Sequence, residues 1–401
     1  MLHSSGQKNA HIIATLKRPE EVDLLRRVYG SGFYLIGIAA SDDTRNEFFR
    51  ERGLEPQEQL SLVEIDAAEK DDSGQHTRDT FCLSDVFVSL GPHSAQIERF
   101  LDIIFGNPFE TPTQNERSMY LAYASSLSSG DLARQVGAAL IDEKGDCLGL
   151  GWNEVPKAGG GLYGPEDGEH RDKDKGADSN DTEKFNMAEK IIRKLIPDIQ
   201  EDKITIKEMK ELLKDTGFFD ITEFGRAVHA EMAAILSCAR TGRSPVNGIL
   251  FVTTFPCHNC TRHIIASGIK KVYYIEPYAK SKALQLHDDA CSENQTELSE
   301  RKVPFLPFIG IGPRRFLDLF SLKLSSGYPI ERKTEGKKIP WSRKTAAPRL
   351  QMAPVSYLIR ERLASKDLTE IFFHSQIETG IEGDVHAAIG TEPLGDNQPN
   401  C

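Results

Sequence analysis

The sequence has no apolar run long enough to cross a membrane, and its N-terminus lacks the hydrophobic segment of a signal peptide. Its seven cysteines are an odd number without a disulfide-like spacing, which favours a reducing compartment. Positive charge is also scarce, since the net charge is −11, whereas large nucleic-acid surfaces depend on Lys and Arg meeting phosphates. We therefore expect a soluble, cytoplasmic protein with no membrane partner. Nucleic acid is not the expected substrate, although a pocket for one nucleotide is compatible with this charge.

The N-terminal part alternates short apolar runs with amphipathic segments, which predicts βαβ units and a parallel sheet. The predicted strands are His11–Leu16, Phe33–Ala40 and Ser84–Leu90. Helices are predicted after Pro19, after Ser41 and through Ile97, Leu101 and Ile104. A chain of 401 residues has room for two or more domains. This part resembles a nucleotide-kinase-like α/β fold.

One motif of such a kinase is missing. A phosphate-binding loop has the pattern GxxxxGK[ST], and no segment matches it. Gly336 and Lys337 are followed by Lys338, and Glu331 stands five positions before Gly336. We interpret residues 1–110 as a degenerate or shortened kinase-like domain without phosphoryl transfer of its own. A plain structural domain is the alternative.

Two short motifs carry the chemistry. They are His229-Ala230-Glu231 and Pro256-Cys257-His258-Asn259-Cys260. Two cysteines at this spacing bind one metal ion readily, and a His from another segment supplies a third ligand. Three protein ligands leave a tetrahedral zinc with one position for water, and zinc lowers the pKa of bound water to about 7. Glu231 would face the site without joining the metal shell and could carry protons.

A structural zinc is the alternative for these motifs. Such a site needs a fourth, closing ligand, and His258 or His263 could supply it. A structural site has no use for the carboxylate of Glu231, however. The motifs therefore favour a catalytic Zn²⁺.

From Thr113 onward the predicted elements follow a different order. A helix is predicted over 113–129, and it is followed by strands at 136–141 and 147–151. A helix from His229, a strand over 248–253, a helix from Cys257 and a strand over 271–275 come next. A further strand and a helix are predicted within 303–320. Metal ligands would then lie at the starts of two adjacent helices, whose free N–H groups stabilise thiolates.

Residues 113–156 and 225–287 resemble the cytidine/deoxycytidylate deaminase family through ARQVGAALID, GWNEVP, VHAEMAA, TTFPCHNCTRHIIASGI and KKVYYIEPY. The wider chain resembles multidomain bacterial anti-phage dCTP/dCMP deaminases with an N-terminal kinase-like domain, through GQHTRDTFCLSDVFV, AGGGLYGPEDGEHRD, EPYAKSKALQLHDD and VPFLPFIGIGPRRFLDLF. The resemblance implies a three-layer α/β/α deaminase domain with a mixed sheet at 111–330, preceded by a partial P-loop-kinase-like α/β domain. Related deaminases associate through helices beside the active site, so a homo-oligomer is implied.

The resemblance also assigns roles to single residues. It implies His229, Cys257 and Cys260 as zinc ligands and Glu231 as general acid and base. Asn153 in GWNEVP matches the position that holds the nucleoside, with a plain turn residue as the alternative. Candidate phosphate ligands are Arg134 before QVGA, Lys280 after the last core strand, and Arg314 at the start of a later helix.

Two segments lie outside this core. Residues 157–224 form an insertion with a charged run and a helix through Ile191 and Ile192. The charged run is typical of a solvated loop, although a long insertion could also form a lid over the pocket. Residues 331–401 form a C-terminal extension, of which 382–401 is predicted to be disordered.

These observations predict a zinc hydrolase that deaminates free deoxycytidine nucleotides, dCMP or dCTP, and so depletes the nucleotide pool available to a phage. Two alternatives stay open. One is a cytosine deaminase that acts on nucleic acid, which the acidic composition disfavours. The other is a zinc-dependent nucleotide-sensing regulatory protein, which the intact Glu231 disfavours.

Overall fold

The computed structural model describes residues 10–40, 42–55, 57–59, 61–62, 76–89, 94–196, 205–214, 216–278, 280–293, 302–350 and 359–366. The chain divides into two compact units. The first consists of Met1–Val22 and Tyr34–Gln351, and the second of Asp23–Phe33 and Met352–Cys401. None of the helices within the described ranges combines the length and apolar character that a membrane span requires.

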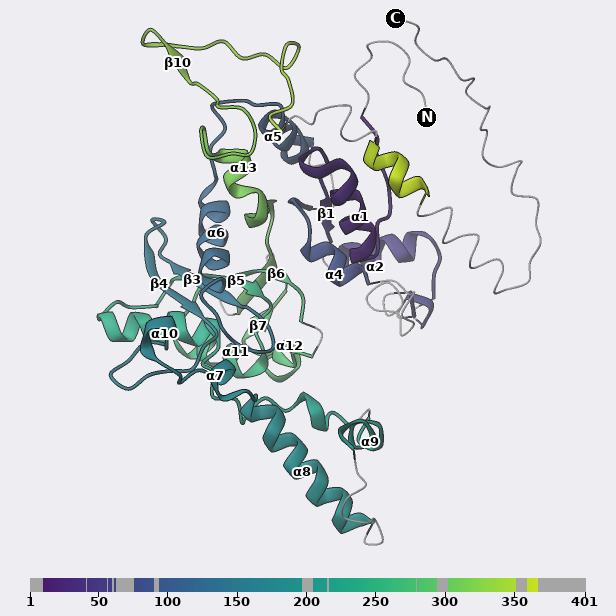
Figure 1. Cartoon of the computed structure of the whole chain (residues 1–401), viewed down its shortest axis with the longest axis vertical. Helices are drawn as coiled ribbons and strands as arrows, with labels where there is room; N and C mark the ends of the chain where they lie inside the picture. The colour runs from purple at the N-terminus through teal and green to yellow at the C-terminus, as the bar shows by residue number, and fades with distance from the viewer. Residues whose placement is uncertain are drawn as a thin grey trace, which may run out of the picture. The chain divides into compact units, whose positions relative to one another are not determined.

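A mixed six-stranded sheet forms the centre of the first unit (Figure 1). Its strand order is β4-β3-β5-β6-β8-β7. β3 is antiparallel to β4 and β5, whereas β5, β6, β8 and β7 run parallel to one another. The strands are β3 Gly137–Ile141, β4 Cys147–Trp152, β5 Ile249–Thr254, β6 Lys271–Glu276, β7 Cys291–Ser292 and β8 Val303–Pro307. The predicted α/β class with a mixed sheet is confirmed.

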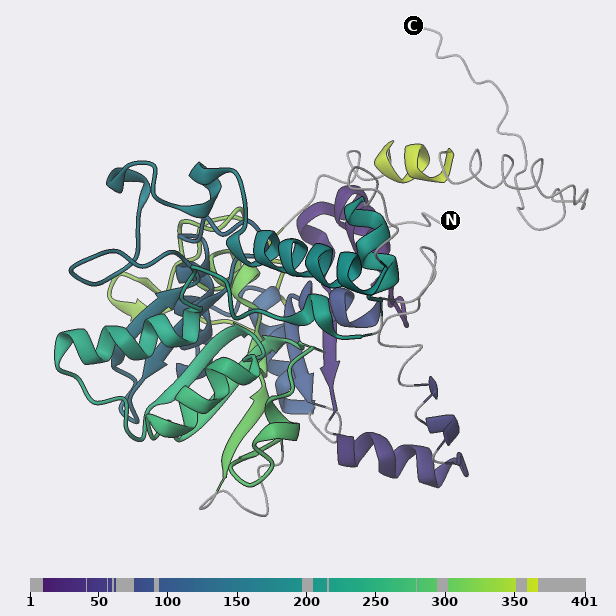
Figure 2. The same ribbon diagram turned by 90° about the horizontal axis from the view of Figure 1, so that it is seen from below.

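All five residues of β3 are buried, because helices cover both faces of the sheet. Ala138 and Leu140 point to one face and pack against α10 (Ala230–Thr241) and α11 (His258–Ala266). Figure 2 shows both helices on the same side of the sheet. The short helix α12 is Ala283–Leu286, and Ala283 belongs to the same apolar cluster.

The alternate residues Ala139 and Ile141 point to the opposite face, as the two-residue period of a strand requires. There they meet Met119 and Ala122 of α6 (Gln114–Ser126) and Phe87. The sheet thus lies between α10 and α11 on one face and α6 on the other, which is the predicted three-layer arrangement.

The start of α6 agrees with the predicted helix over 113–129. Thr113 caps it, since its side chain accepts from Glu116 N at 3.2 Å while Glu116 Oε2 accepts from Thr113 N at 2.7 Å. The Glu116 carboxylate also accepts from Arg99 Nη1 at 2.7 Å and from Ile311 N at 2.8 Å. This buried carboxylate therefore joins α6 to two other segments.

A second, three-stranded sheet has the order β1-β2-β9. β1 and β2 are parallel, as predicted for the N-terminal part, and β9 is antiparallel to β2. The strands are β1 Ile36–Ala39, β2 Val86–Ser89 and β9 Gly310–Ile311, and the helices nearby in sequence are α2 Asp42–Glu51, α4 Thr77–Cys82 and α5 Ser94–Ile104. The kinase-like resemblance of this region stays a prediction.

The predicted strand His11–Leu16 is wrong, because residues 11–18 contain no strand. Ile12 is 94% exposed and Ile13 is 52% exposed. The apolar run therefore finds neither a neighbouring strand for its backbone groups nor a core for its side chains. An apolar run alone does not form a strand when no neighbouring strand pairs with it.

The run predicted as one strand after residue 302 is divided between two sheets. β8 joins the six-stranded sheet, whereas β9 pairs with β2 of the three-stranded sheet. η4 (Pro313–Arg315) and α13 (Phe316–Phe320) follow, as the predicted helix suggested. The domain boundaries at 110 and 330 stay predictions, and Tyr34–Gln351 lies within one compact unit.

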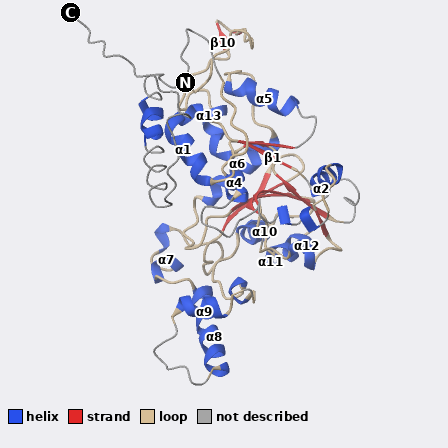
Figure 3. Ribbon diagram, turned by 90° about the vertical axis from the view of Figure 1, so that its right-hand side faces the viewer, coloured by secondary structure: helices blue, strands red, loops and turns tan. Residues whose placement is uncertain are grey.

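The insertion contains α8 and α9, which extend away from the six-stranded sheet (Figure 3). Ala188, Ile192 and Met209 form a small apolar cluster of their own, which confirms the predicted helix through Ile192. The elements are η2 Pro165–Asp167, α7 Asp172–Lys175, α8 Ser179–Leu195, α9 Ile206–Leu212 and η3 Phe218–Asp220.

Further elements lie at the two ends of the chain. α1 is Pro19–Tyr29 and is followed by η1 at Gly30–Gly32. Within the second unit, residues 359–366 are helical, and the Tyr29 hydroxyl donates to Glu361 Oε1 at 3.2 Å. In the first unit, β10 Lys333–Thr334 and β11 Lys337–Lys338 form an exposed hairpin. The predicted disordered segment 382–401 lies outside the described residues.

The central role of Glu116 can be tested by unfolding. Its side chain is 0% exposed, whereas Glu110, which also pairs with Arg99, is 31% exposed. Glu116→Ala leaves part of a buried ion pair and a backbone N–H without a partner, so we expect a loss of about 3 kcal/mol in the free energy of unfolding. The matched control Glu110→Ala should cost under about 1 kcal/mol. Urea denaturation measures both, and equal losses would contradict this account.

Candidate metal centre and substrate cavity

The three predicted metal ligands lie at the N-terminal ends of two helices that pack on the same face of the sheet. His229 is the N-cap of α10, and Cys257 is the N-cap of α11. Val228 is held by a two-way backbone bridge with Glu154, at 3.2 and 3.0 Å. Cys257 follows the end of β5 and Pro256, which cannot continue the strand's hydrogen bonding. These constraints fix where each ligand side chain begins.

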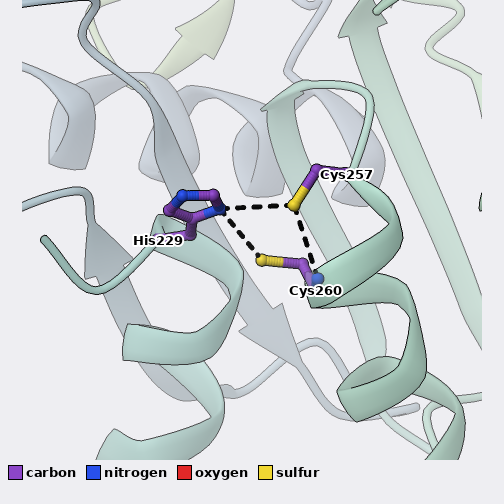
Figure 4. Close-up of side chains that lie close together, drawn as sticks. All are labelled: His229, Cys257 and Cys260. Atoms are coloured by element: carbon purple, nitrogen blue, oxygen red, sulfur yellow. Dashed lines mark hydrogen bonds between the residues drawn. The ribbon is translucent and has the colours of Figure 1, made fainter. Parts of the chain in front are cut away.

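The side chains of His229, Cys257 and Cys260 point toward one another (Figure 4). His229 Nδ1 lies 3.4 Å from the Sγ of Cys257 and 3.4 Å from the Sγ of Cys260. In tetrahedral zinc, bond lengths near 2.3 Å to sulfur and 2.1 Å to nitrogen place these atoms roughly 3.6 Å apart. One nitrogen and two sulfurs at this spacing fit a zinc ion.

Hydrogen bonds among His229, Cys257 and Cys260 shift their pKa values. A hydrogen bond from Cys260, together with one from His229, lowers the pKa of Cys257 to about 4. The hydrogen bond with Cys257 raises the pKa of His229 to about 9. The bond to Cys257 and burial raise the pKa of Cys260. Cys257 is thus held as a thiolate, the form that binds metals.

Glu231 is the second residue of α10 and is 4% exposed. Burial raises the pKa of its carboxyl group. It lines the same cavity as His229 and Cys257. A buried carboxyl in this position can hold a proton and release it, as the sequence predicts.

The alternative of a closed structural site finds no support. Among the residues that the structure describes, the group whose ligand atoms could share a metal has three members, His229, Cys257 and Cys260. Neither His258 nor His263 belongs to it. A zinc ion held by these three residues would have a fourth coordination position available for another ligand.

The cavity beside the metal centre has a volume of about 210 Å³. Of the predicted site residues, it brings together His229, Glu231, Cys257, Asn153 and Arg134. Cys260 lies just behind the wall and is 1% exposed. Other core residues that line the cavity are Asp131, Thr254, Phe255 and Tyr278.

Asn153 is 6% exposed and fixes the backbone of a neighbouring loop. Its Oδ1 accepts from Val136 N at 2.7 Å, and its Nδ2 donates to Arg134 O at 2.8 Å. An amide has two donor hydrogens and two acceptor lone pairs, so these two bonds use one of each, and Asn153 also lines the cavity. Asn153 therefore both holds the loop of Arg134 and Val136 and lines the cavity.

Arg134 reaches the cavity from the loop that Asn153 holds. Its Nη1 lies 3.1 Å from Glu276 Oε1, and its guanidinium lies 5.5 Å from the ring centre of Tyr278. Glu276 Oε2 in turn accepts from the Thr254 hydroxyl at 3.1 Å. An exposed cation is therefore oriented at the cavity rim.

Lys280 and Arg314 do not line the cavity. Lys280 Nζ pairs with Asp220 Oδ1 at 2.6 Å, and both side chains are exposed. Arg314 is an exposed residue of η4, the turn that follows β9 in the three-stranded sheet. The structure does not bring these two predicted phosphate ligands to the metal centre.

The sequence did not identify the cavity residues that come from the connecting segment, by which we mean residues 157–228 between β4 and α10. Those residues are Asp172, Asp178, Asn180, Thr222, Gly225, Arg226 and Ala227. The one available signal was the position of Arg226, three residues before His229. Most of the run that was predicted to be solvated is exposed, as expected, but Asp172, Asp178 and Asn180 within it line the cavity.

A buried ion pair anchors the connecting segment. Arg171 and Glu154 have side chains 5% and 2% exposed, and Arg171 Nε donates to Glu154 Oε2 at 2.7 Å. Glu154 also accepts from Gly130 N at 3.0 Å, and Arg171 donates to Ser128 O at 3.3 Å. A Cβ at residue 130 would meet the Arg171 guanidinium, so a larger residue there would displace this side chain from its present position.

The comparison with protein families identifies the core of the first unit. A family model described as "Cytidine and deoxycytidylate deaminase zinc-binding region" matches residues 112–276. This range holds α6, both ligand helices and the sheet from β3 to β6. Residues 112–276 are therefore similar to a zinc-binding region of deaminases, and His229, Cys257 and Cys260 within them are the residues that could hold a Zn²⁺ cofactor.

Curated relatives match over shorter stretches. The chain is 42% identical over 77 residues to ComE operon protein 2 of Bacillus subtilis (strain 168), covering 19% of this chain and 41% of that protein. It is 47% identical over 55 residues to the deoxycytidylate deaminase of Enterobacteria phage T4, covering 14% of this chain and 28% of that protein. The chain thus spans less than half the length of these relatives.

Among solved structures, a dCMP deaminase from the cyanophage S-TIM5 in complex with dCMP and dUMP is similar at 20% identity and a TM-score of 0.29. The match covers 50% of this chain and 99% of that one. A tRNA:A34 deaminase is similar at 16% identity and a TM-score of 0.25, covering 49% of this chain and 100% of that one. Because both scores lie under 0.5, the fold assignment depends on the strand order described above.

The metal centre predicts how zinc content depends on its cysteines. Cys257→Ser removes the thiolate ligand, so we expect the purified variant to lose most of its zinc. Cys147→Ser changes a half-buried cysteine of β4 outside the ligand group and should keep one zinc per chain. Metal analysis by inductively coupled plasma mass spectrometry measures both. Full zinc content in Cys257→Ser would contradict the assigned ligand set.

Proposed function

We propose that this chain is a zinc-dependent hydrolase that deaminates free deoxycytidine nucleotides to deoxyuridine nucleotides and ammonia. The observation that carries the proposal is the placement of Glu231, a buried carboxyl, in one cavity with the His229–Cys257–Cys260 group. Two further findings support it. The family match covers all four residues, and the phage T4 relative is a deoxycytidylate deaminase.

The proposed reaction replaces the amino group on C4 of cytosine with an oxygen from water. Zinc, when bound, supplies a water whose pKa is lowered to about 7. Glu231 takes a proton from the attacking water, and it then delivers protons to N3 and to the departing ammonia. Water and the aminopyrimidine are consumed, and the carbonyl and ammonia are formed. Burial, which raises the pKa of Glu231, suits this exchange of protons.

Asn153 and Arg134 are the proposed substrate-binding residues of the core. The remaining donor and acceptor of the Asn153 amide could bind the sugar or the base. Arg134 stands at the rim with a guanidinium suited to a phosphate. The match of GWNEVP to the nucleoside-holding motif of the family supports the role of Asn153.

The charges of the cavity favour the less charged nucleotide. Four carboxylates line it, those of Asp131, Asp172, Asp178 and Glu231, whereas Arg134 and Arg226 supply two cations. Each additional phosphate group would bring more negative charge next to these carboxylates, and like charges repel. We therefore propose dCMP as the preferred substrate, with dCTP as the second.

The cellular role follows the resemblance to anti-phage deaminases. Deamination of dCMP or dCTP would drain the deoxycytidine nucleotide pool on which phage replication depends. A cytoplasmic homo-oligomer with an N-terminal kinase-like region is part of this proposal. Size-exclusion chromatography with light scattering would test the oligomer separately from the activity.

The first experiment is ammonia release by zinc-loaded protein with dCMP, dCTP, CMP and a cytosine-containing single-stranded DNA. We expect turnover of dCMP above that of dCTP, and none of the DNA. Activity on the DNA alone would replace this proposal with a nucleic-acid deaminase. Silence with all four substrates, with zinc bound, would favour a nucleotide-sensing protein.

Glu231→Gln tests the proton carrier. The amide keeps the size of the side chain but cannot exchange protons, so we expect turnover of dCMP to fall roughly 10²- to 10⁴-fold while zinc content is unchanged. Glu183→Gln alters an exposed residue of α8 and serves as the control. Retained turnover in Glu231→Gln would remove Glu231 from the mechanism.

A further inference from the structure

The connecting segment places a second arginine in the cavity. Arg226 lines it together with Glu231 and Arg134, and its side chain is 32% exposed. Arg226 lies three residues before His229, and three residues of chain span at most about 10 Å. The backbone of Arg226 therefore lies close enough to His229 for one nucleotide to reach from the metal centre to the Arg226 side chain.

The guanidinium of Arg226 is held by the beginning of the same segment. Nη1 lies 2.6 Å from Asp172 Oδ1, and Nη2 donates to His170 O at 3.2 Å. A guanidinium carries five N–H donors in a rigid fork. Two bonds to the protein orient this fork and leave further donors for a ligand.

The position of Asp172 is fixed in turn by its neighbour Arg171. Arg171 forms the buried ion pair with Glu154 and reaches Ser128 O, so the backbone on the N-terminal side of Asp172 is tied to the core. Arg226 thus inherits its orientation from a buried interaction rather than from a flexible surface. Such preorganisation reduces the entropy that binding must overcome.

We propose that Arg226 is a specificity-determining residue that binds the 5′-phosphate of the deoxycytidine nucleotide. This inference rests on the proposed function. Phosphates commonly accept from more than one guanidinium, and Arg134 and Arg226 reach the cavity from separate segments. Asp172 offsets part of the positive charge of Arg226, so the gain in affinity is moderate. If Arg226 only held the two ends of the connecting segment together through Asp172, its loss would affect a nucleotide and a nucleoside equally.

The test compares Arg226→Gln with Arg193→Gln. Arg193, on α8, has the same 32% side-chain exposure and is paired with Glu189, but it does not line the cavity. For Arg226→Gln we expect KM for dCMP to rise roughly tenfold, as for the loss of one charge-assisted hydrogen bond, with kcat within about twofold. Activity on deoxycytidine should be unchanged. Arg226→Lys should recover part of the loss, and Arg193→Gln should behave like the wild type.

Two results would overturn the inference. One is an equal loss for dCMP and deoxycytidine, and the other is a lower kcat for dCMP with an unchanged KM. If the wild type does not turn over deoxycytidine, the KM and kcat values for dCMP are sufficient to test the role of Arg226. A wild type that releases no ammonia from any nucleotide contradicts the proposed function instead. Calorimetric titration with dUMP then tests Arg226 separately, because an unchanged affinity in Arg226→Gln would overturn its phosphate role.

Discussion

The metal centre depends on the close approach of α10 to the central sheet. Ala230 and Ala234 face β3 and β4, and a Cβ at residue 151 would collide with the Ala230 carbonyl oxygen. Only a glycine in β4 lets the first turn of α10 come this near. Because His229 caps that turn and Glu231 lies within it, the packing of small residues sets the positions of both side chains together. The geometry of the site is therefore a property of the core.

Glu154 couples this core to the connecting segment. Its backbone forms the bridge to Val228, next to His229, while its carboxylate accepts from Arg171 and from Gly130 N. Glu154 thus contacts both the residue before His229, at the start of α10, and Arg171 in the connecting segment. Breaking the Arg171 pair would leave a buried carboxylate without its main partner, which costs more than the pair itself contributes. The connecting segment and the start of α10 are consequently linked through one residue, by its backbone and its side chain.

The sequence predicted well what depends on short-range patterns. The short apolar run of β3 and the spacing of the HAE and PCHNC motifs predicted a strand of the sheet, the helix starts and the group of possible metal ligands. It failed where the outcome depended on distant partners. The run His11–Leu16 found no neighbouring strand, and β9 left the sheet of β8 to pair with β2. Lys280 was predicted as a phosphate ligand, whereas the structure pairs it with Asp220.

The connecting segment shows why charge composition alone could not reveal its role. Residues 165–184 are dense in charge, which is typical of a solvated loop. Yet Arg171 in that run is 4% exposed, and Asp172 reaches Arg226 across 54 residues of sequence. A charge is tolerated in the interior only when a partner of opposite sign meets it there, and that partner is specified by the fold. Composition therefore predicts that most of this run is exposed, but it does not identify which of its residues pair in the interior or line the cavity.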